Sequence, residues 1–376
     1  MVTTTLFAQM SLDTSKVYSL HEVVVVGQQP NAEIIPVQTL SNEMLQRLSA
    51  HSVADALRYF SGVQLKDYGG VGGLKTVNVR SLGTNHVGVF YDGIAIGNAQ
   101  NGQVDMGRFS LDNMEAISLY NGQKSALLQS ARDFASANAI YMTTRKPVFD
   151  DGENSHVRLT YKTGSFDALN PSALWEHKWS KHLHSSVNVE QLYTSGKYRF
   201  RYAKKDGYDT TEVRQNGDVT MWRAEAALFG TLRDGEWRAK AYYYRSERGF
   251  PGAAVREEPG KFRHADRQWD DNFFVQGSFR KTFSTLYSLL LNGKYAYDYL
   301  HYRSDPRLDV TTMYVDNQYR QQETYFSSAH EFAFFDFWKA ALASDFQFNT
   351  LDADLWDFVY PNRYLWLTSA ATSLHF

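Results

Sequence analysis

The side chains of this chain that are best suited to bind a ligand are amides and tyrosines rather than nucleophiles. Carboxamide groups both donate and accept hydrogen bonds, so a run of them between small residues suits a large polar ligand. The candidate contacts lie in two segments: Tyr68, Gly69 and Gly70 in the first, and Asn98, Gln100 and Asn101 in the second, which is the amide-rich one. Tyr198, Tyr202 and Tyr208 lie in a long polar segment that is able to close over such a ligand.

Motifs for catalysis are absent from the sequence. There is no P-loop, no HExxH motif and no serine-centred elbow, and the chain has no cysteine. His182 and His184 have strand spacing, but they lie at a turn, where two histidines are more often solvated than metal ligands. Glu257-Glu258 and Asp270-Asp271 are interpreted as solvated loop charges, with a loop calcium site as the alternative. We therefore predict no catalytic residue, no enzyme activity and no resident metal or cofactor.

Composition narrows the class of protein further. The net charge of −2 provides no basic field for nucleic acid, and 15% of the 376 residues are aromatic. No stretch reaches the roughly 18 apolar residues that a membrane-spanning helix needs. The aromatic excess fits either a soluble β protein or a β-barrel with aromatic girdles at the membrane interfaces.

The first part of the chain, to about residue 147, has the pattern of a small α+β domain. Ser52 followed by Asp55 is a capping-box pattern that predicts a helix over Val53 to Tyr59. Asp92-Gly93 predicts a tight turn. Short strands are predicted at residues 77–80, 87–91, 116–120 and 139–144.

From about residue 155 the pattern changes to long segments in which apolar and polar residues alternate. This period of two predicts strands with one apolar and one polar face. Ten strands are predicted, at residues 155–165, 172–179, 184–194, 218–231, 236–247, 271–282, 286–301, 318–334, 338–350 and 363–376. Short turns alternate with long polar loops, which is typical of outer-membrane barrels.

Ten strands are too few to enclose the first domain. A globule of that size is roughly 36 Å across, whereas ten tilted strands close to only about 20 Å and about 22 strands to roughly 44 Å. An open sheet would also leave unpaired backbone groups in lipid. We therefore expect a barrel of about 22 strands, of which this chain holds the first ten and lacks a C-terminal part.

Several motifs resemble those of the TonB-dependent outer-membrane receptors. Leu20 to Gly27 is similar to the TonB box, an extended apolar segment. Five further segments, in the family's order, resemble the plug-domain motifs: residues 52–63, 77–83, 89–93, 114–122 and 139–147. Ser61 stands where the family has proline, Ser81-Leu82 precede Gly83, and residues 132–137 stand where glycines are usual.

The resemblance implies four parts and their key residues. They are a signal-peptide remnant and leader (1–19), the TonB box (20–27), a plug domain (28–147) and the N-terminal part of a transmembrane antiparallel β-barrel (148–376). It assigns TonB binding to His21, Glu22, Val23, Val24, Val25 and Val26, through addition of a strand to a partner sheet. It assigns plug-motif roles to Arg80, Gly83, Asp92, Gly93 and Gly122. Arg80 and Asp92 are the charges expected to meet the barrel wall.

The resemblance also implies function and location. Such receptors lie in the bacterial outer membrane, bind a scarce nutrient and import it with energy from the inner-membrane TonB complex, sometimes with a surface lipoprotein. The amino-acid sequences of the segments Arg80 to Thr84 and Gly97 to Gly102 resemble those of cobalamin-type receptors. Ferric siderophore or haem is the alternative substrate within the family. A passive porin-like barrel and a soluble binding protein are the alternatives from other classes.

Overall fold

The computed structural model describes residues 37–48, 50–68, 71, 73–98, 102–203, 207, 209–251, 266–304, 314–354 and 359–374. The described residues up to 147 are called the plug region below. Its elements are β1 (Val37–Ser41), α1 (Asn42–Arg47), α2 (Val53–Leu57), β2 (Val63–Asp67), β3 (Lys75–Val79), η2 (Thr84–His86), β4 (Val87–Tyr91), β5 (Ile94–Ile96), η3 (Met106–Arg108), β6 (Met114–Tyr120), α3 (Ala131–Phe134) and β7 (Asn138–Thr144).

The plug region is built on a five-stranded mixed sheet in the order β1-β6-β7-β4-β5. Only β4 and β7 are parallel, and β2 pairs with β3 in a separate hairpin. The helix α2 and the segment at η3 cover an apolar core in which Leu57, Phe109, Ile117 and Ile140 are fully buried. None of the helices in the described part of the chain is both long and apolar enough to span a membrane.

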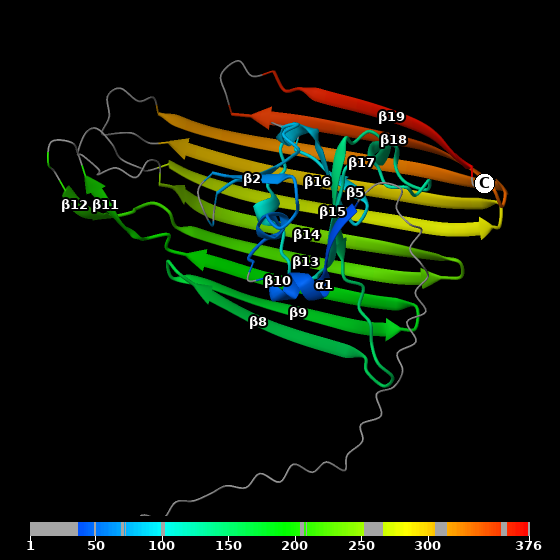
Figure 1. The fold of residues 1–376 in the computed structure, drawn as a ribbon, viewed down its shortest axis with the longest axis horizontal. Coiled ribbons are helices and arrows are strands. Elements are labelled where there is room, and N and C mark those ends of the chain that lie inside the picture. The colour runs from blue at the N-terminus through cyan, green and yellow to red at the C-terminus, as the bar shows by residue number, and fades with distance from the viewer. Residues whose placement is uncertain are drawn as a thin grey trace, which may run out of the picture. The chain divides into compact units, whose positions relative to one another are not determined.

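The second part of the chain forms one antiparallel ten-stranded sheet, in the order β19-β18-β17-β16-β15-β14-β13-β10-β9-β8 (Figure 1). Its strands are β8 (Ser155–Gly164), β9 (Ala168–Ser180), β10 (Leu183–Thr194), β13 (Val219–Leu232), β14 (Gly235–Phe250), β15 (Asp266–Ser284), β16 (Tyr287–Ser304), β17 (Val315–Phe335), β18 (Trp338–Ala353) and β19 (Asn362–Leu374). Every predicted strand is present, including the poorly alternating segments around Tyr325 and Tyr364.

Most connections between these strands sort by length to the two edges of the sheet (Figure 1). Two-residue turns such as Arg233-Asp234 join strands at one edge, which we call the short-turn edge, whereas the three-residue turn between β8 and β9 lies at the other edge. The other edge, the long-loop edge, carries four long connections. One of these was expected to be an irregular loop, but it contains a hairpin of β11 (Arg199–Ala203) and β12 (Asp209–Val213). These two strands are five residues each, which is too short for an alternating pattern to be recognised in the sequence.

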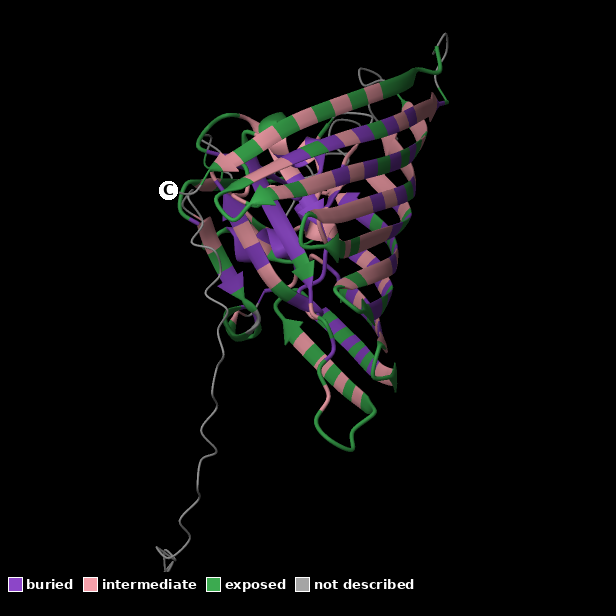
Figure 2. Ribbon diagram, turned by 90° about the vertical axis from the view of Figure 1, so that its right-hand side faces the viewer, coloured by how far each residue is buried: buried purple, intermediate pink, exposed green. Residues whose placement is uncertain are grey.

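Burial alternates along most of the ten strands, and the more buried side carries many of the polar and charged residues (Figure 2). Arg223, Glu225 and Lys240 are almost completely buried on the inner face. The outer face carries exposed large apolar residues, such as Trp222 and Phe346. In a strand with period two, successive side chains point to opposite faces of the sheet. In a soluble protein the apolar face is buried, whereas here the apolar face is turned outward, as in a transmembrane barrel.

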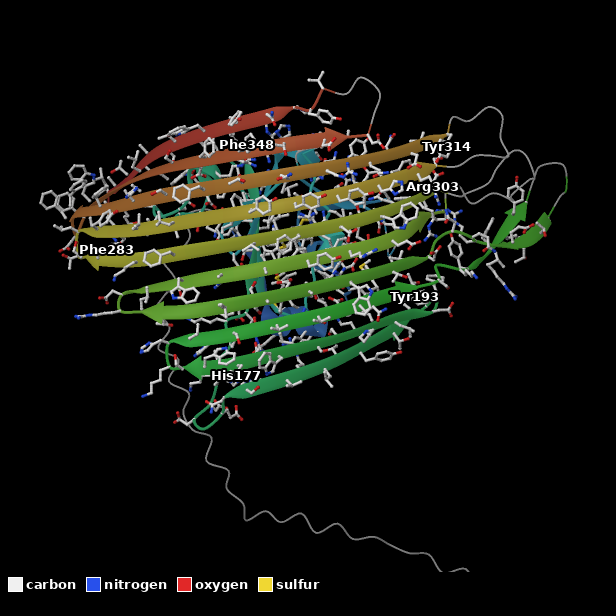
Figure 3. All side chains as sticks on the ribbon, turned by 180° about the vertical axis from the view of Figure 1, so that it is seen from behind. His177, Tyr193, Phe283, Arg303, Tyr314 and Phe348 are labelled. Carbon is white, nitrogen blue, oxygen red and sulfur yellow. The ribbon has the colours of Figure 1, made fainter. Side chains whose placement is uncertain are left out.

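Aromatic side chains lie on the outer face near both edges (Figure 3). Tyr193 lies toward the long-loop edge and Phe283 toward the short-turn edge, and both are exposed. Trp175 and Trp179 flank His177 near the short-turn edge, with ring centroids 5.6 Å and 4.6 Å from the imidazole. Aromatic rings at the two ends of an apolar band are typical of a sheet that crosses a bilayer.

Two local predictions for the plug region were wrong in detail. The helix after Ser52 ends at Leu57 rather than Tyr59, and the Ser52 side chain does not cap it. The reason is that the Asp55 carboxylate takes the hydroxyl: Ser52 Oγ donates to Asp55 Oδ2 at 3.0 Å, while Lys75 Nζ lies 3.0 Å from Asp55 Oδ1. An ion pair to β3 therefore replaces the expected reciprocal cap.

Candidate functional site

A cavity of about 200 Å³ lies between the plug region and the sheet at the long-loop edge. We call it the long-loop cavity. The plug region supplies residues from the end of the β2–β3 hairpin and from the segment that follows β5 and includes η3: Leu74, Asn98, Gln103, Asp105 and Arg108. Strands β14 to β17 supply Tyr244, Arg248, Gln268, Asp270, Asn272, Asp298, Tyr299, Leu300, Tyr319 and Gln321.

The charges of the long-loop cavity are paired with one another. Arg248 lies 2.8 Å from Asp270 and 3.5 Å from Asp105. Arg108 lies 3.7 Å from Asp298. The lining therefore holds three carboxylates and two guanidinium groups, together with five carboxamides and three tyrosines. Such a lining offers hydrogen bonds in both directions to a polar ligand and no excess of positive charge.

The turn between β4 and β5 places the Asp92 carboxylate in contact with the ten-stranded sheet. Asp92 and Gly93 both have positive φ, 52° and 83°, as a tight two-residue hairpin requires. Thr144 donates to Asp92 from its backbone N and its hydroxyl, each at 2.8 Å. Lys240 Nζ lies 2.8 Å from Asp92 Oδ2, and Arg238 pairs with Oδ1.

The Lys240 ammonium also joins this turn to a second buried carboxylate. It lies 3.2 Å from Glu225, which accepts hydrogen bonds from Tyr91 at 2.6 Å and from Asn113 at 2.9 Å. Burial alone raises the pKa of the Asp92 carboxyl, but the attraction of Lys240 and Arg238 and the hydrogen bonds outweigh it, so that this pKa lies below its ordinary value. We call Tyr91, Asp92, Glu225, Arg238 and Lys240 the central cluster.

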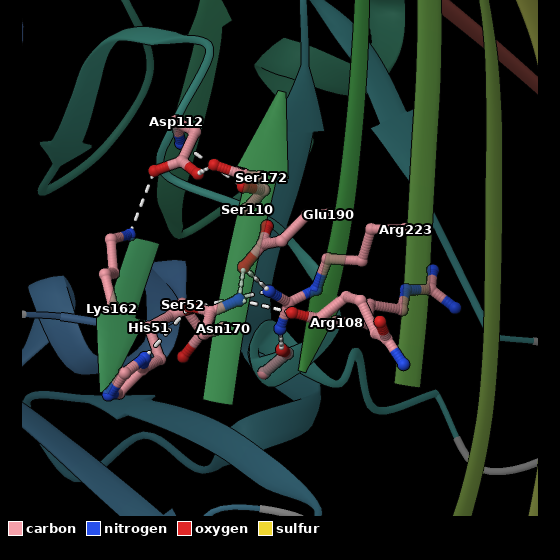
Figure 4. A network of polar contacts seen from close by, with 12 residues as sticks. His51, Ser52, Arg108, Ser110, Asp112, Lys162, Asn170, Ser172, Glu190 and Arg223 are labelled. Carbon is pink, nitrogen blue, oxygen red and sulfur yellow. Dashed lines mark hydrogen bonds and ion pairs between the residues drawn. The ribbon is translucent and has the colours of Figure 1, made fainter. Parts of the chain in front are cut away.

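A second polar network holds the α2 side of the plug region (Figure 4). The buried Arg223 guanidinium donates to the backbone O of His51 at 3.1 Å and of Gly107 at 2.6 Å. Its charge is balanced by Glu190 at 2.8 Å, which also accepts from Asn170. An arginine from β13 thus inserts into the plug region and hydrogen-bonds its loops directly.

A third contact holds the short helix α3 against the far strands. The backbone N of Ala131 and of Arg132 donate to the two carboxylate oxygens of Asp345 at 3.1 Å and 2.8 Å. Tyr325 donates to the same carboxylate at 2.8 Å. These are first-turn N–H groups that lack partners within a helix, so a carboxylate there is favoured by both hydrogen bonding and the helix dipole.

The comparisons with known proteins agree with this arrangement. Residues 31–132 match the family model described as the TonB-dependent Receptor Plug Domain. The vitamin B12 transporter BtuB of Photobacterium profundum is 33% identical over 117 residues, which are 30% of this chain and 19% of that relative.

Two solved structures share the fold. The copper transporter OprC has a TM-score of 0.64 at 15% identity, covering 88% of this chain and 50% of that structure. The iron transporter FrpB of Neisseria meningitidis has a TM-score of 0.66 at 11% identity, covering 85% and 50%. Residues 31–132 are thus a plug domain of the TonB-dependent receptors, and the plug region with its ten-stranded sheet has the fold of these solved transporters. The chain spans about half the length of these solved relatives, and its outward apolar face is the lipid-facing side of an outer-membrane protein.

Of the ligand contacts expected in this receptor, the structure places Asn98 in the long-loop cavity. The exposed Tyr68 lies next to it, because its backbone N donates to the O of Leu74, a lining residue, at 3.0 Å. Gly69, Gly70, Gln100 and Asn101 lie outside the described residues, as do Tyr208 and the TonB-box residues 21–26. Tyr198 and Tyr202 belong to the β11–β12 hairpin region at the long-loop edge.

The plug-motif residues have different surroundings in the receptor. Asp92 and Gly93 form the turn at the central cluster, as described above. Gly83 and Gly122 adopt positive φ, 96° and 139°, which glycine tolerates without strain. Arg80 also has positive φ, 50°, and is exposed; its backbone N donates to Gly62 O at 2.9 Å. No described residue forms an ion pair with the Arg80 side chain.

Sequence reasoning did not single out the wall residues of these contacts. Glu190, Arg223, Glu225, Lys240 and Asp345 all lie at inner-face positions of alternating strands. The sequence does contain a pattern that could have identified them. In a strand whose apolar face is turned outward, a charged residue on the opposite face is buried and needs a partner inside the protein. The pattern marks such residues as inward, but it does not say which plug residue each one meets.

Proposed function

We propose that this receptor imports a large, neutral, amide-bearing nutrient, cobalamin, across the outer membrane with energy from the TonB complex. The observation that carries the proposal is the charge balance of the long-loop cavity. Its two guanidinium groups face three carboxylates, and five carboxamides complete the lining. A ligand rich in amides finds donors and acceptors there without having to bring its own charge.

Anionic ferric chelates would bind more weakly to this lining. Binding sites for anions usually present arginine or lysine in excess, because desolvated negative charge needs a close counter-charge. Here Arg248 and Arg108 already have carboxylate partners. A copper ion would also lack soft donors, since the described lining contains no His, Met or Cys.

The relatives support the same substrate. The B12 transporter BtuB is similar to 30% of this chain. The sequence of Arg80 to Thr84 in the plug region also resembles that of cobalamin-type receptors. The iron transporter FrpB and the copper transporter OprC share only the fold at this level of identity. A ferric siderophore is therefore the second candidate.

Energy from TonB would enter through the segment that precedes the plug sheet. We assign TonB binding to residues 21–26, which would add a strand to the partner's sheet edge. The first described strand after this segment is β1, which lies at the edge of the plug sheet and pairs with β6 among the described strands. A pull there would peel β1 first, while β4 and β5 at the opposite edge stay held by the central cluster until it breaks.

Calorimetry on the full-length receptor in detergent tests the substrate. Nanomolar binding of cobalamin is expected, with no comparable binding of ferric siderophores. Folded receptor that binds a ferric chelate and not cobalamin would replace the substrate and leave the transport class standing.

Uptake by cells tests the class of protein. Deletion of residues 22–26 should abolish energy-dependent uptake and leave cobalamin binding at the cell surface unchanged. Uptake that survives the deletion would indicate a passive porin.

A further inference from the structure

The connection between β10 and β13, which carries the β11–β12 hairpin, is pinched where it leaves the long-loop edge (Figure 1). Gly196 and Gly217 pass each other so closely that a Cβ atom on Gly196 would collide with the backbone of Gly217. Gly196 also has a φ of 60°, a conformation that favours glycine. We call this crossing of the two glycines the neck of the hairpin. Both ends of the hairpin segment pass through it, so the contacts on either side of the neck decide how the hairpin is held.

The turn between β8 and β9 holds one side of the neck. Phe166 and Asp167 both have positive φ, 64° and 57°, which is uncommon for residues other than glycine. The backbone N of Ser195 donates to the O of Phe166 at 3.0 Å, and the Ser195 hydroxyl donates to the Asp167 carboxylate at 2.6 Å. The ring centroids of Phe166 and Tyr198 are 5.6 Å apart. A strained turn thus fixes the residue before the neck and contacts one of the tyrosines expected to close over a ligand.

Asn216 holds the other side of the neck against the next long connection, which runs from β14 to β15. Its carboxamide nitrogen donates to the backbone O of Phe250, the last residue of β14, at 3.0 Å and to that of Asp266, the first residue of β15, at 2.9 Å. Asn216 has a φ of 55°, which asparagine adopts more readily than most residues. A Cβ atom on Gly249 would collide with Asn216, so the Asn216 side chain lies directly on the backbone of β14. One carboxamide therefore joins the base of the hairpin to both ends of the β14–β15 connection.

The strands that Asn216 contacts are among those that build the long-loop cavity. Arg248 and Gln268 line that cavity and lie opposite each other in register, each two residues from a carbonyl that Asn216 binds. Asp266 extends the contacts to β16, because its carboxylate accepts a hydrogen bond from the Tyr302 hydroxyl at 2.9 Å. The base of the hairpin is therefore connected to three strands of the cavity wall.

We propose that Asn216 is a positioning residue for ligand capture, which holds the β11–β12 hairpin and its tyrosines in place for a ligand in the long-loop cavity. The ligand part of this proposal rests on the proposed import function, whereas the effect of Asn216 on the hairpin does not. Tyr198 and Tyr202 present hydroxyl groups from a hairpin that is fixed on both sides of its neck. A binding surface that is ordered in advance loses less conformational entropy when the ligand binds, so the ligand is held more tightly. Asn216 acts through the hairpin that it holds.

Hydrogen exchange of the full-length receptor in detergent, read by mass spectrometry, tests the effect on the hairpin. Asn216→Asp keeps the size of the side chain and its tolerance of positive φ but removes the donor. We expect the backbone amides of β11 and β12 to exchange about tenfold faster, while those of β16 and β17 keep their rates. Gln215→Glu makes the same change from amide to acid at the exposed neighbouring residue and should exchange like the unmodified receptor. Hairpin exchange that is equal in the two variants would overturn the proposal.

Binding kinetics of cobalamin on the same proteins test the effect on capture. Asn216→Asp should release cobalamin about fivefold faster with an association rate within about twofold, because contacts made after the first encounter affect mainly dissociation. Gly249→Ala, which displaces the carboxamide and leaves Asn216 itself unchanged, should have the same effect. Dissociation as slow as in the unmodified receptor would overturn the role in capture, even if the hairpin exchanges faster. If the unmodified receptor binds no cobalamin, the proposed function fails, and hydrogen exchange alone decides whether Asn216 positions the hairpin.

Discussion

The long-loop cavity and a cavity of about 290 Å³ at the short-turn edge, the short-turn cavity, share strands β14 to β16, yet they differ in charge. At the long-loop edge, arginines are matched by carboxylates and amides dominate. At the short-turn edge, two lysines and two arginines line the cavity beside three carboxylates. Asp92 and Arg238 of the central cluster line the short-turn cavity. The inner face of the sheet carries many polar residues but also apolar ones such as Met221 and Phe274, and the charge difference arises from both sheet and plug residues at each end.

The largest effect is expected from breaking the central cluster. Lys240→Met would leave Asp92 and Glu225 buried without their shared cation. Removing one partner of a buried ion pair costs about 3–5 kcal/mol, and we expect a loss of that size in the free energy of unfolding of the full-length receptor. Denaturant unfolding in detergent measures it.

The matched control removes the stranded charges as well. A triple variant with Lys240→Met, Asp92→Asn and Glu225→Gln should recover most of the lost stability. A loss below about 1 kcal/mol for Lys240→Met alone would mean that the cluster does not hold the two regions together.

Acid should weaken the same cluster by a smaller amount, because the cations remain. The pKa of Asp92 in the folded protein lies below its ordinary value of 3.8. Its contribution is therefore complete above pH 3.8 and is lost as the pH falls through the folded pKa. Thermal unfolding of the receptor between pH 7 and pH 3 should show this loss, and Asp92→Asn should make the curve flatter in the acid range. An equally steep curve in the variant would assign the acid sensitivity elsewhere.

We expect a substitution in the long-loop cavity to change the affinity for cobalamin more than a substitution in the short-turn cavity does. Asn98→Leu removes a carboxamide from the long-loop cavity, and we expect cobalamin to bind about tenfold more weakly, or about 1.4 kcal/mol. Arg280→Gln, in the short-turn cavity, should leave this affinity within about twofold. Calorimetry on both variants checks the contrast, and equal losses would show that the ligand senses both ends at once.

The smallest effect is expected at the rim of the short-turn cavity. Lys146 and Glu236 lie 3.7 Å apart with 42% and 57% of their side chains exposed. An exposed pair of this kind contributes about 0–1 kcal/mol, so Lys146→Gln should change stability by less than about 0.5 kcal/mol. A larger change in chemical denaturation would mean that this rim carries part of the contact between plug and sheet.

The strands were predictable because their alternation is a local property. Trp237, Ala239 and Ala241 face one side while Arg238 and Lys240 face the other, and this pattern needs no knowledge of the partner strands. Short elements with little periodicity were not predicted. β11 and β12 are five residues each, and α3 is four residues long in the segment where the family's glycines are absent.

The candidate site was only partly predictable, for a related reason. Asp92 stood out because its turn with Gly93 has a sequence signature, and Asn98 because it lies among small residues. Their surroundings could not be anticipated: the contact between Tyr91 and Glu225 joins residues 134 positions apart, and that between Ala131 and Asp345 joins residues 214 apart.

By itself, the sequence determined the two-part organisation, the ten strands, the direction of their apolar faces and the polar character of the inner face. These follow from period-two alternation and from turn chemistry, which act over a few residues. Only the tertiary structure decided which inward charges meet. The alternation places Arg223, Lys240 and Asp345 inside, but the docking of the plug region against particular strands selects His51, Asp92 and Ala131 as their partners. Burial then makes each pairing obligatory, because an inward charge without a counterpart would cost several kcal/mol.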